Sequence, residues 1–168
     1  MKVRKLCECA LLIAMAILFQ LIEASIPLPY VIPGFKLGLA NCVAMIALYR
    51  YDNRTMTFVN LMRVVLAALM RGTLFQISFW LSFAGAICAS LAMWFTKRFT
   101  PCTIYGTGMA GSSAHVIAQV AVIMLLYEQW RMIAVLPLLL VTGIPTGIAI
   151  AWIAALVLKR LPMKEGEE

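Results

Sequence analysis

Long apolar segments, interrupted only by short polar turns, take up most of this sequence and restrict the folds open to it. The chain is 64% hydrophobic and only 12% charged, whereas soluble domains carry roughly 25% charged residues. A bilayer core needs about 20 mostly apolar residues for each crossing helix. We therefore predict an all-α integral membrane protein, a compact bundle of six transmembrane helices with no soluble catalytic domain.

Polar turns, glycines and prolines mark where each predicted helix ends. The helices are expected at roughly residues 6–25, 37–49, 55–70, 74–95, 104–127 and 133–158, with a charged tail at 159–168. The second helix is short for a full crossing, and Pro145 is expected to kink the sixth. No repeat or linker divides the sequence, so residues 1–168 are predicted to form a single transmembrane domain.

The basic residues predict the orientation of this bundle. With six crossings, ten Lys and Arg residues fall on one side, Lys36, Arg71 and Arg131 fall on the other, and Arg63 is in mid-helix. Because basic loops are retained in the cytoplasm, both termini are predicted to face it. The same residues are spread between apolar segments and form no single basic face, so the net charge of +7 does not indicate nucleic-acid binding.

A proline-rich segment, IPLPYVIPGFKLGLAN at residues 26–41, separates the first two predicted helices. Pro27, Pro29 and Pro33 each remove a backbone donor and disfavour helix. Gly34 can take the positive φ that a tight turn needs. We predict that this segment is a stiff gate loop above a polar pocket.

Polar residues inside the predicted helices are the candidates for that pocket, because charges in lipid are costly and face the protein interior. Asn60, Arg63 and Arg71 share one face of the third helix. Arg63 is expected to meet Glu23 or an anionic ligand, and a structural ion pair and a ligand contact both remain open.

The fifth and sixth helices add further candidates. His115 and Gln119 are four residues apart on one face, where His115 is a hydrogen-bonded core residue, a ligand contact or a proton relay. A single histidine in the membrane is a poor metal site, and no metal or cofactor is predicted. Glycines beside Pro145 suit either a ligand wall or a close helix crossing. The predicted substrate-binding residues are Glu23, Lys36, Asn41, Arg63, Arg71, His115, Gln119, Thr142 and Thr146.

Two alanines on the first helix form a separate, smooth face. Ala10 and Ala14 are four residues apart, and small residues at this spacing allow another helix to approach closely. A partner protein and a helix of the same chain are both open as the neighbour.

Two enzyme classes are excluded by missing residues. Residues 106–113, GTGMAGSS, have the glycine spacing of a P-loop, but Ser112 stands where the lysine is required, so we predict no ATP hydrolysis. Asp52 is the only aspartate, so no aspartate-rich motif can hold the Mg²⁺ of a prenyl diphosphate synthase. We predict that the protein is not an enzyme.

Several motifs together resemble one bacterial membrane family. They are PGFKLGLAN at residues 33–41, LMR at 61–63, Ala114-His115 with Gln119, and TGIPTG at 142–147. They resemble the Gx transporter family, which is also labelled heptaprenyl diphosphate synthase component I. That family is similar to the substrate-binding S-components of energy-coupling factor transporters, which import vitamins and related precursors.

The resemblance implies a bacterial cytoplasmic membrane protein with six helices, both termini inside, and substrate bound under the loop between helices one and two. It implies that Ala10 and Ala14 dock on a transmembrane coupling protein and that partner subunits hydrolyse ATP. Because Lys36, Arg63 and Arg71 outnumber Glu23, we expect an anionic ligand. A basic wall with aromatic neighbours suits a quinone- or flavin-related small molecule, and the resemblance implies a vitamin-like one. Membrane lipid is expected to surround the protein. The alternatives are a non-transporting scaffold of an electron-transfer assembly and an accessory subunit of a prenyl diphosphate or quinone pathway.

Overall fold

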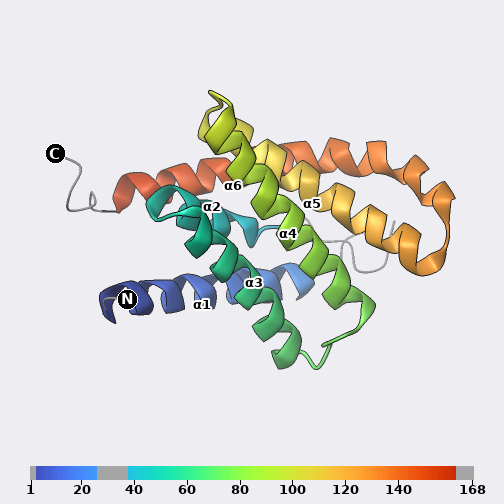
Figure 1. Ribbon diagram of the computed structural model, residues 1–168, viewed down its shortest axis with the longest axis horizontal. Helices are drawn as coiled ribbons and strands as arrows, with labels where there is room; N and C mark the ends of the chain where they lie inside the picture. Colours follow the sequence, from blue (N-terminus) through green and yellow to red (C-terminus); the bar gives the residue numbers. More distant parts are fainter. Residues whose placement is uncertain (1–2, 26–37, 162–168) are drawn as a thin grey trace.

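The computed structural model describes residues 3–25 and 38–161, which form helices joined by short turns, with no strand in these two ranges (Figure 1). The helices are α1 (Val3–Ser25), α2 (Asn41–Arg50), α3 (Asn53–Met70), α4 (Ile77–Phe99), α5 (Ile104–Tyr127), the 3₁₀ helix η1 (Trp130–Val135) and α6 (Leu136–Arg160). The prediction of an all-α bundle is therefore confirmed for this part of the chain.

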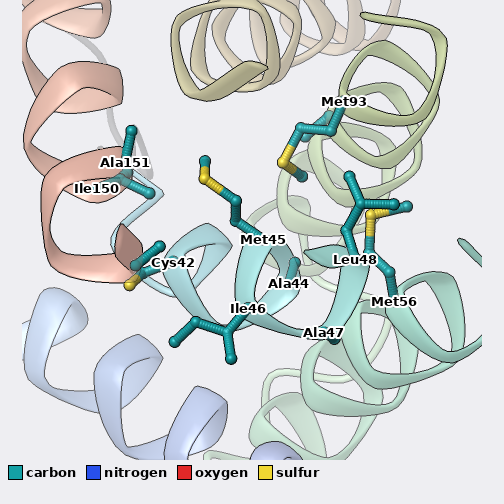
Figure 2. Packing of buried hydrophobic residues seen from close by; sticks show 12 residues of the cluster. Cys42, Ala44, Met45, Ile46, Ala47, Leu48, Met56, Met93, Ile150 and Ala151 are labelled. Atoms are coloured by element: carbon teal, nitrogen blue, oxygen red, sulfur yellow. The ribbon is translucent and has the colours of Figure 1, made fainter. Parts of the chain in front are cut away.

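The short helix α2 lies at the centre of the bundle. It contacts all five other α-helices, and every residue from Asn41 to Leu48 is buried. Figure 2 shows the side chain of Met45 lying between Ile150 of α6 and Met93 of α4. Around it, α5 lies against both α4 and α6, and α3 lies against α1 and α4. In Figure 1 the start of α1 and the end of α6 are on the same side of the view.

Within residues 3–25 and 38–161, four segments are long and apolar enough to cross a membrane: Lys5–Glu23, Ile77–Phe99, Ile104–Tyr127 and Trp130–Arg160. Many large apolar side chains on them are exposed, such as Leu11, Leu125 and Trp152, as expected where lipid replaces water as the solvent. The chain is therefore a multi-pass membrane protein. With ten residues α2 is about 15 Å long, too short to cross a core of about 30 Å, so six crossings and the orientation of the termini stay predictions.

Helices α1 and α3 begin three and two residues earlier than expected, whereas three other helices begin later. Helix α2 begins at Asn41 and not at residue 37, because Gly38 has a φ of 83° and turns the chain. Helix α4 begins at Ile77 and not at residue 74, because Gly72 and Phe75 both have positive φ values. Helix α6 begins at Leu136 and not at residue 133, because the preceding residues, Trp130–Val135, form the 3₁₀ helix η1. Helix α6 continues through Pro145, and the expected kink there stays a prediction.

Glycines bring α5 and α6 into backbone contact. A Cβ atom added to Gly108 would lie 2.5 Å from the carbonyl oxygen of Gly147, and one added to Gly147 would overlap Ser112 Oγ. Real Cβ atoms essentially never approach so closely, so only glycine fits at either position. The glycines near Pro145 therefore form a close helix crossing, which was one of the two alternatives left open by the sequence.

Hydrogen bonds connect the polar turn between α2 and α3 to α1. Asp52 caps α3, with Oδ1 accepting a hydrogen bond from the Thr55 N–H (2.6 Å) and Oδ2 accepting one from Lys5 Nζ (3.5 Å). The hydrogen bonds from Thr55 and the nearby Lys5 ammonium lower the pKa of Asp52 below its ordinary value. Tyr51 donates to Glu8 Oε2 (2.7 Å), and burial together with this hydrogen bond raises the pKa of Tyr51 to about 12.

Asp52→Ala should lower the stability of the protein by about 1 kcal/mol, because it removes the N-cap of α3. The ionised form of Asp52 stabilises the fold above its ordinary pKa, and this contribution is lost as the pH falls through the lowered pKa. Asp52→Asn keeps an acceptor and cannot titrate. Between about pH 6 and pH 3, the melting temperature of wild type should therefore fall further than that of Asp52→Asn. Equal falls would show that the cap does not depend on charge.

Candidate functional site

The buried guanidinium of Arg63 is the centre of the candidate site. Its side chain is only 3% exposed and donates three hydrogen bonds to three amide oxygens. Nε donates to Asn60 Oδ1 (2.7 Å), Nη1 to Gln20 Oε1 (2.9 Å) and Nη2 to Asn41 Oδ1 (2.9 Å). These acceptors come from α3, α1 and α2, so Arg63 holds three helices together through one planar group.

Glu23 is the acidic residue whose charge acts on Arg63, and the hydrogen-bond acceptors of Arg63 are neutral amides. Glu23 is buried and interacts electrostatically with Arg63. Its Oε1 also accepts a hydrogen bond from the N–H of Gly38 (2.5 Å). Since an uncompensated buried charge is costly, Glu23 and Arg63 depend on each other, which is the pairing that the sequence suggested for Arg63.

Asn60 extends this network to α4. Its Nδ2 donates to the carbonyl oxygen of Ala86 (3.0 Å) and to Ser90 Oγ (2.7 Å), while its Oδ1 accepts from Arg63. The amide of Asn60 therefore uses both its donor and its acceptor groups, and it fixes the position of Arg63 relative to α4.

His115 and Gln119 of α5 form a second buried pair, with His115 Nε2 3.1 Å from Gln119 Nε2. The imidazole lies against Gly85 of α4, where an added Cβ would be 2.6 Å from His115 Nδ1. Only a glycine at position 85 leaves room for the ring in this place.

Gly38 connects the two groups. A Cβ on Gly38 would lie 2.8 Å from Asn41 Nδ2 and 3.6 Å from His115 Cδ2, so its Cα lies between the Arg63 network and the imidazole. We call the combined set the polar cluster. It consists of Gln20, Glu23, Asn41, Asn60, Arg63, His115 and Gln119.

Two atoms of the polar cluster retain unused hydrogen-bonding capacity. Asn41 Nδ2 and Gln119 Oε1 are buried and have no hydrogen-bond partner among the residues that the structure describes. An unpaired buried polar group costs about 1–3 kcal/mol, so buried groups of this kind call for an explanation. They offer one donor and one acceptor to a polar molecule that reaches the cluster.

Five of the predicted substrate-binding residues lie in the polar cluster, namely Glu23, Asn41, Arg63, His115 and Gln119, and their role in binding stays a prediction. Gln20 and Asn60 also belong to the cluster, although they are not among the predicted substrate-binding residues. Each lies three residues before a predicted member, Gln20 before Glu23 and Asn60 before Arg63. Helical spacing was the signal that could have added them.

Three other predicted residues do not belong to the polar cluster. Arg71 is exposed and lines a narrow cavity of about 10 Å³ that also contacts Gln20, with room for roughly one water molecule. The hydroxyl of Thr142 donates to Leu139 O (2.9 Å) and that of Thr146 to Gly143 O (2.8 Å). Both threonines thus bond to their own helix.

The remaining predictions concern the gate loop and the docking face. Lys36, Pro27, Pro29, Pro33 and Gly34 lie outside the described residues, so their roles stay predictions. The docking face is described, and there Ala10 and Ala14 are exposed on α1.

The described part of the chain contains no group of three or more His, Cys, Asp and Glu side chains that could hold a metal ion. The polar cluster is thus an arrangement of amides, one imidazole, one guanidinium and one carboxyl group. Such groups can bind, orient and neutralise a polar molecule through hydrogen bonds.

Apolar helices of membrane-spanning length, enclosing a buried polar cluster, define the chain as a multi-pass membrane protein. Residues 12–157 match the family model described as heptaprenyl diphosphate synthase component I, and the chain belongs to that family. No curated protein and no solved structure matches the chain.

Proposed function

We propose that the protein is an S-component-like, substrate-binding subunit of an energy-coupling factor importer in the bacterial cytoplasmic membrane. The observation that carries this proposal is the hydrogen bond between Glu23 and Gly38. It holds the chain on both sides of residues 26–37 at the polar cluster. The segment between the first two helices therefore begins and ends at the candidate site, as substrate binding under that segment requires.

Asn41 Nδ2 and Gln119 Oε1, which have no hydrogen-bond partner among the described residues, suggest which kind of molecule the polar cluster binds. Arg63 already donates to three amides and interacts with the charge of Glu23, so its main task is to position Asn41 and Gln20. Asn41 Nδ2 and Gln119 Oε1 then present a donor and an acceptor. A vitamin-like or quinone- or flavin-related molecule with both an acceptor and a donor on one edge fits this pair. An anionic group on it would be met by Arg71 or Lys36.

Small molecules that co-purify with the full-length protein in mild detergent should be extracted and identified by mass spectrometry. We expect wild type to retain one compound and Gln119→Leu to retain about tenfold less, because one buried hydrogen bond is lost. Gln129→Leu is the matched control, since Gln129 is exposed in the turn before η1. The same purification tests for a coupling protein bound at Ala10 and Ala14. An empty wild type, or equal retention by both variants, would remove the polar cluster as a substrate site.

The family description favours a second function, an accessory subunit of prenyl diphosphate synthesis. In that case the protein, added to lipid vesicles that contain the synthase subunit, raises synthase activity. The importer proposal predicts no such increase. Asp52, the only aspartate, lies in the turn before α3 and away from the polar cluster, so the chain supports an accessory role better than a catalytic one.

A further inference from the structure

An open groove of about 230 Å³ lies between α3 and α4, and none of the polar-cluster residues lines it. It is lined by the first turns of α3 and the second half of α4. The lining residues are Asn53, Thr57, Ile87, Ser90, Leu91 and Trp94.

The two walls of this groove differ in chemistry. The α4 wall is mainly apolar and belongs to the candidate span Ile77–Phe99, and Leu91 on it is 58% exposed. The α3 wall is polar. The hydroxyl of Thr57 bonds to the carbonyl oxygen of Asn53 (2.9 Å), whereas the amide side chain of Asn53 has no hydrogen-bond partner within the described ranges. A lipid-facing groove with one polar wall matches an amphipathic occupant.

The residue one helical turn beyond the lining residue Trp94 is basic. Arg98 follows Trp94 by four residues and therefore extends the same helix face by one turn. It is exposed and forms no ion pair with any residue that the structure describes. Its neighbour Lys97 is already engaged, donating to Leu48 O (2.8 Å) and lying 4.4 Å from the ring centroid of Tyr49.

The nearest acid in sequence does not cancel this charge. Asp52 precedes Asn53, but its carboxylate already caps α3 and pairs with Lys5. Trp94 is held in place by an edge contact with Phe99, whose ring centroid is 5.8 Å away. Tryptophan favours the boundary between acyl chains and headgroups, which places the polar end of the groove at headgroup level.

We propose that this groove binds one anionic phospholipid of the surrounding bilayer. The phosphate lies against Arg98 and the Asn53 amide, and one acyl chain follows Ile87 and Leu91. A guanidinium binds phosphate oxygens through paired, charge-assisted hydrogen bonds. Basic residues beside a membrane helix also favour anionic over zwitterionic lipids. This proposal does not depend on the proposed function.

The test uses native mass spectrometry of the full-length protein with phosphatidylglycerol or phosphatidylcholine of identical acyl chains. We expect wild type to retain one phosphatidylglycerol in preference to phosphatidylcholine. Arg98→Ala should retain about tenfold less phosphatidylglycerol and unchanged phosphatidylcholine. Arg160→Ala is the matched control, because Arg160 ends another spanning helix and is exposed outside the groove.

A second variant tests the apolar wall with the charge intact. Leu91→Trp fills the groove at an exposed position and should lower phosphatidylglycerol retention without lowering the melting temperature. Equal losses in Arg98→Ala and Arg160→Ala would show diffuse surface attraction and overturn the proposal. So would equal retention of the two lipids by wild type, or retention that Leu91→Trp leaves unchanged. The proposal would also be overturned if Leu91→Trp caused the loss of a bound protein partner and not of a bound lipid.

Discussion

Replacing Arg63 by alanine is expected to destabilise the protein by about 3–5 kcal/mol, because it leaves a buried opposite charge without its partner. Glu23 would remain buried, and the amide oxygens of Gln20, Asn41 and Asn60 would each lose a donor. Thermal unfolding and detergent-induced unfolding of the purified protein measure the loss.

Two further variants separate charge from geometry. Arg63→Lys keeps the charge, but an ammonium lacks the planar fork that reaches three acceptors, so its stability should be intermediate. Arg131→Ala removes an exposed arginine in η1, and its melting temperature should equal that of wild type. If the melting temperature of Arg63→Ala also equals that of wild type, the polar cluster does not stabilise the fold. A folded Arg63→Ala that loses its ligand would favour the ligand-contact alternative over the structural one.

Gly108→Val is expected to destabilise the protein by about 3 kcal/mol or more, because overpacked sites force the backbone to move. A Cβ at position 108 would lie 2.5 Å from the backbone oxygen of Gly147, which cannot rotate away. The α5 and α6 helices would have to separate along their crossing. Thermal melting and protease sensitivity in detergent report this separation.

Gly143→Ala is the matched control for that substitution. The added methyl would lie 3.3 Å from Val116 Cγ2, and a side-chain tip can shift by a few tenths of an ångström. The higher helix propensity of alanine, worth up to about 1 kcal/mol, offsets the contact. A loss in Gly143→Ala as large as that in Gly108→Val would mean that any added volume on this face is harmful, and that the backbone contact is not special.

Hydrophobic pattern predicted the helices well where polar residues bound them. Helix α5 has the predicted bounds, Ile104–Tyr127, because Pro101 and Glu128 flank a long segment without Asp, Glu, Lys or Arg. The pattern failed at the starts of α2 and α4, where apolar residues continue into turns. Gly38 and Phe75 take positive φ values there, and a hydrophobic residue such as Phe75 gives no sign of a left-handed conformation in the sequence.

The polar cluster was predictable in part. A charge in the middle of an apolar helix must find a buried partner, and this argument identified Arg63 and Glu23. Which amides complete the network depends on how α1, α2 and α3 rotate against one another, and a single sequence does not contain that rotation. For the same reason Thr142 and Thr146 were assigned to the site, although their hydroxyls bond to the backbone of α6.

Ser90 belongs to two environments at once. It lines the groove between α3 and α4, and its Oγ accepts the hydrogen bond of Asn60, which in turn accepts from Arg63. The outer wall of the protein and its central charge are thus separated by a single amide. We therefore expect the affinity of the polar cluster for a ligand to depend on the lipid composition of the bilayer in which it is measured.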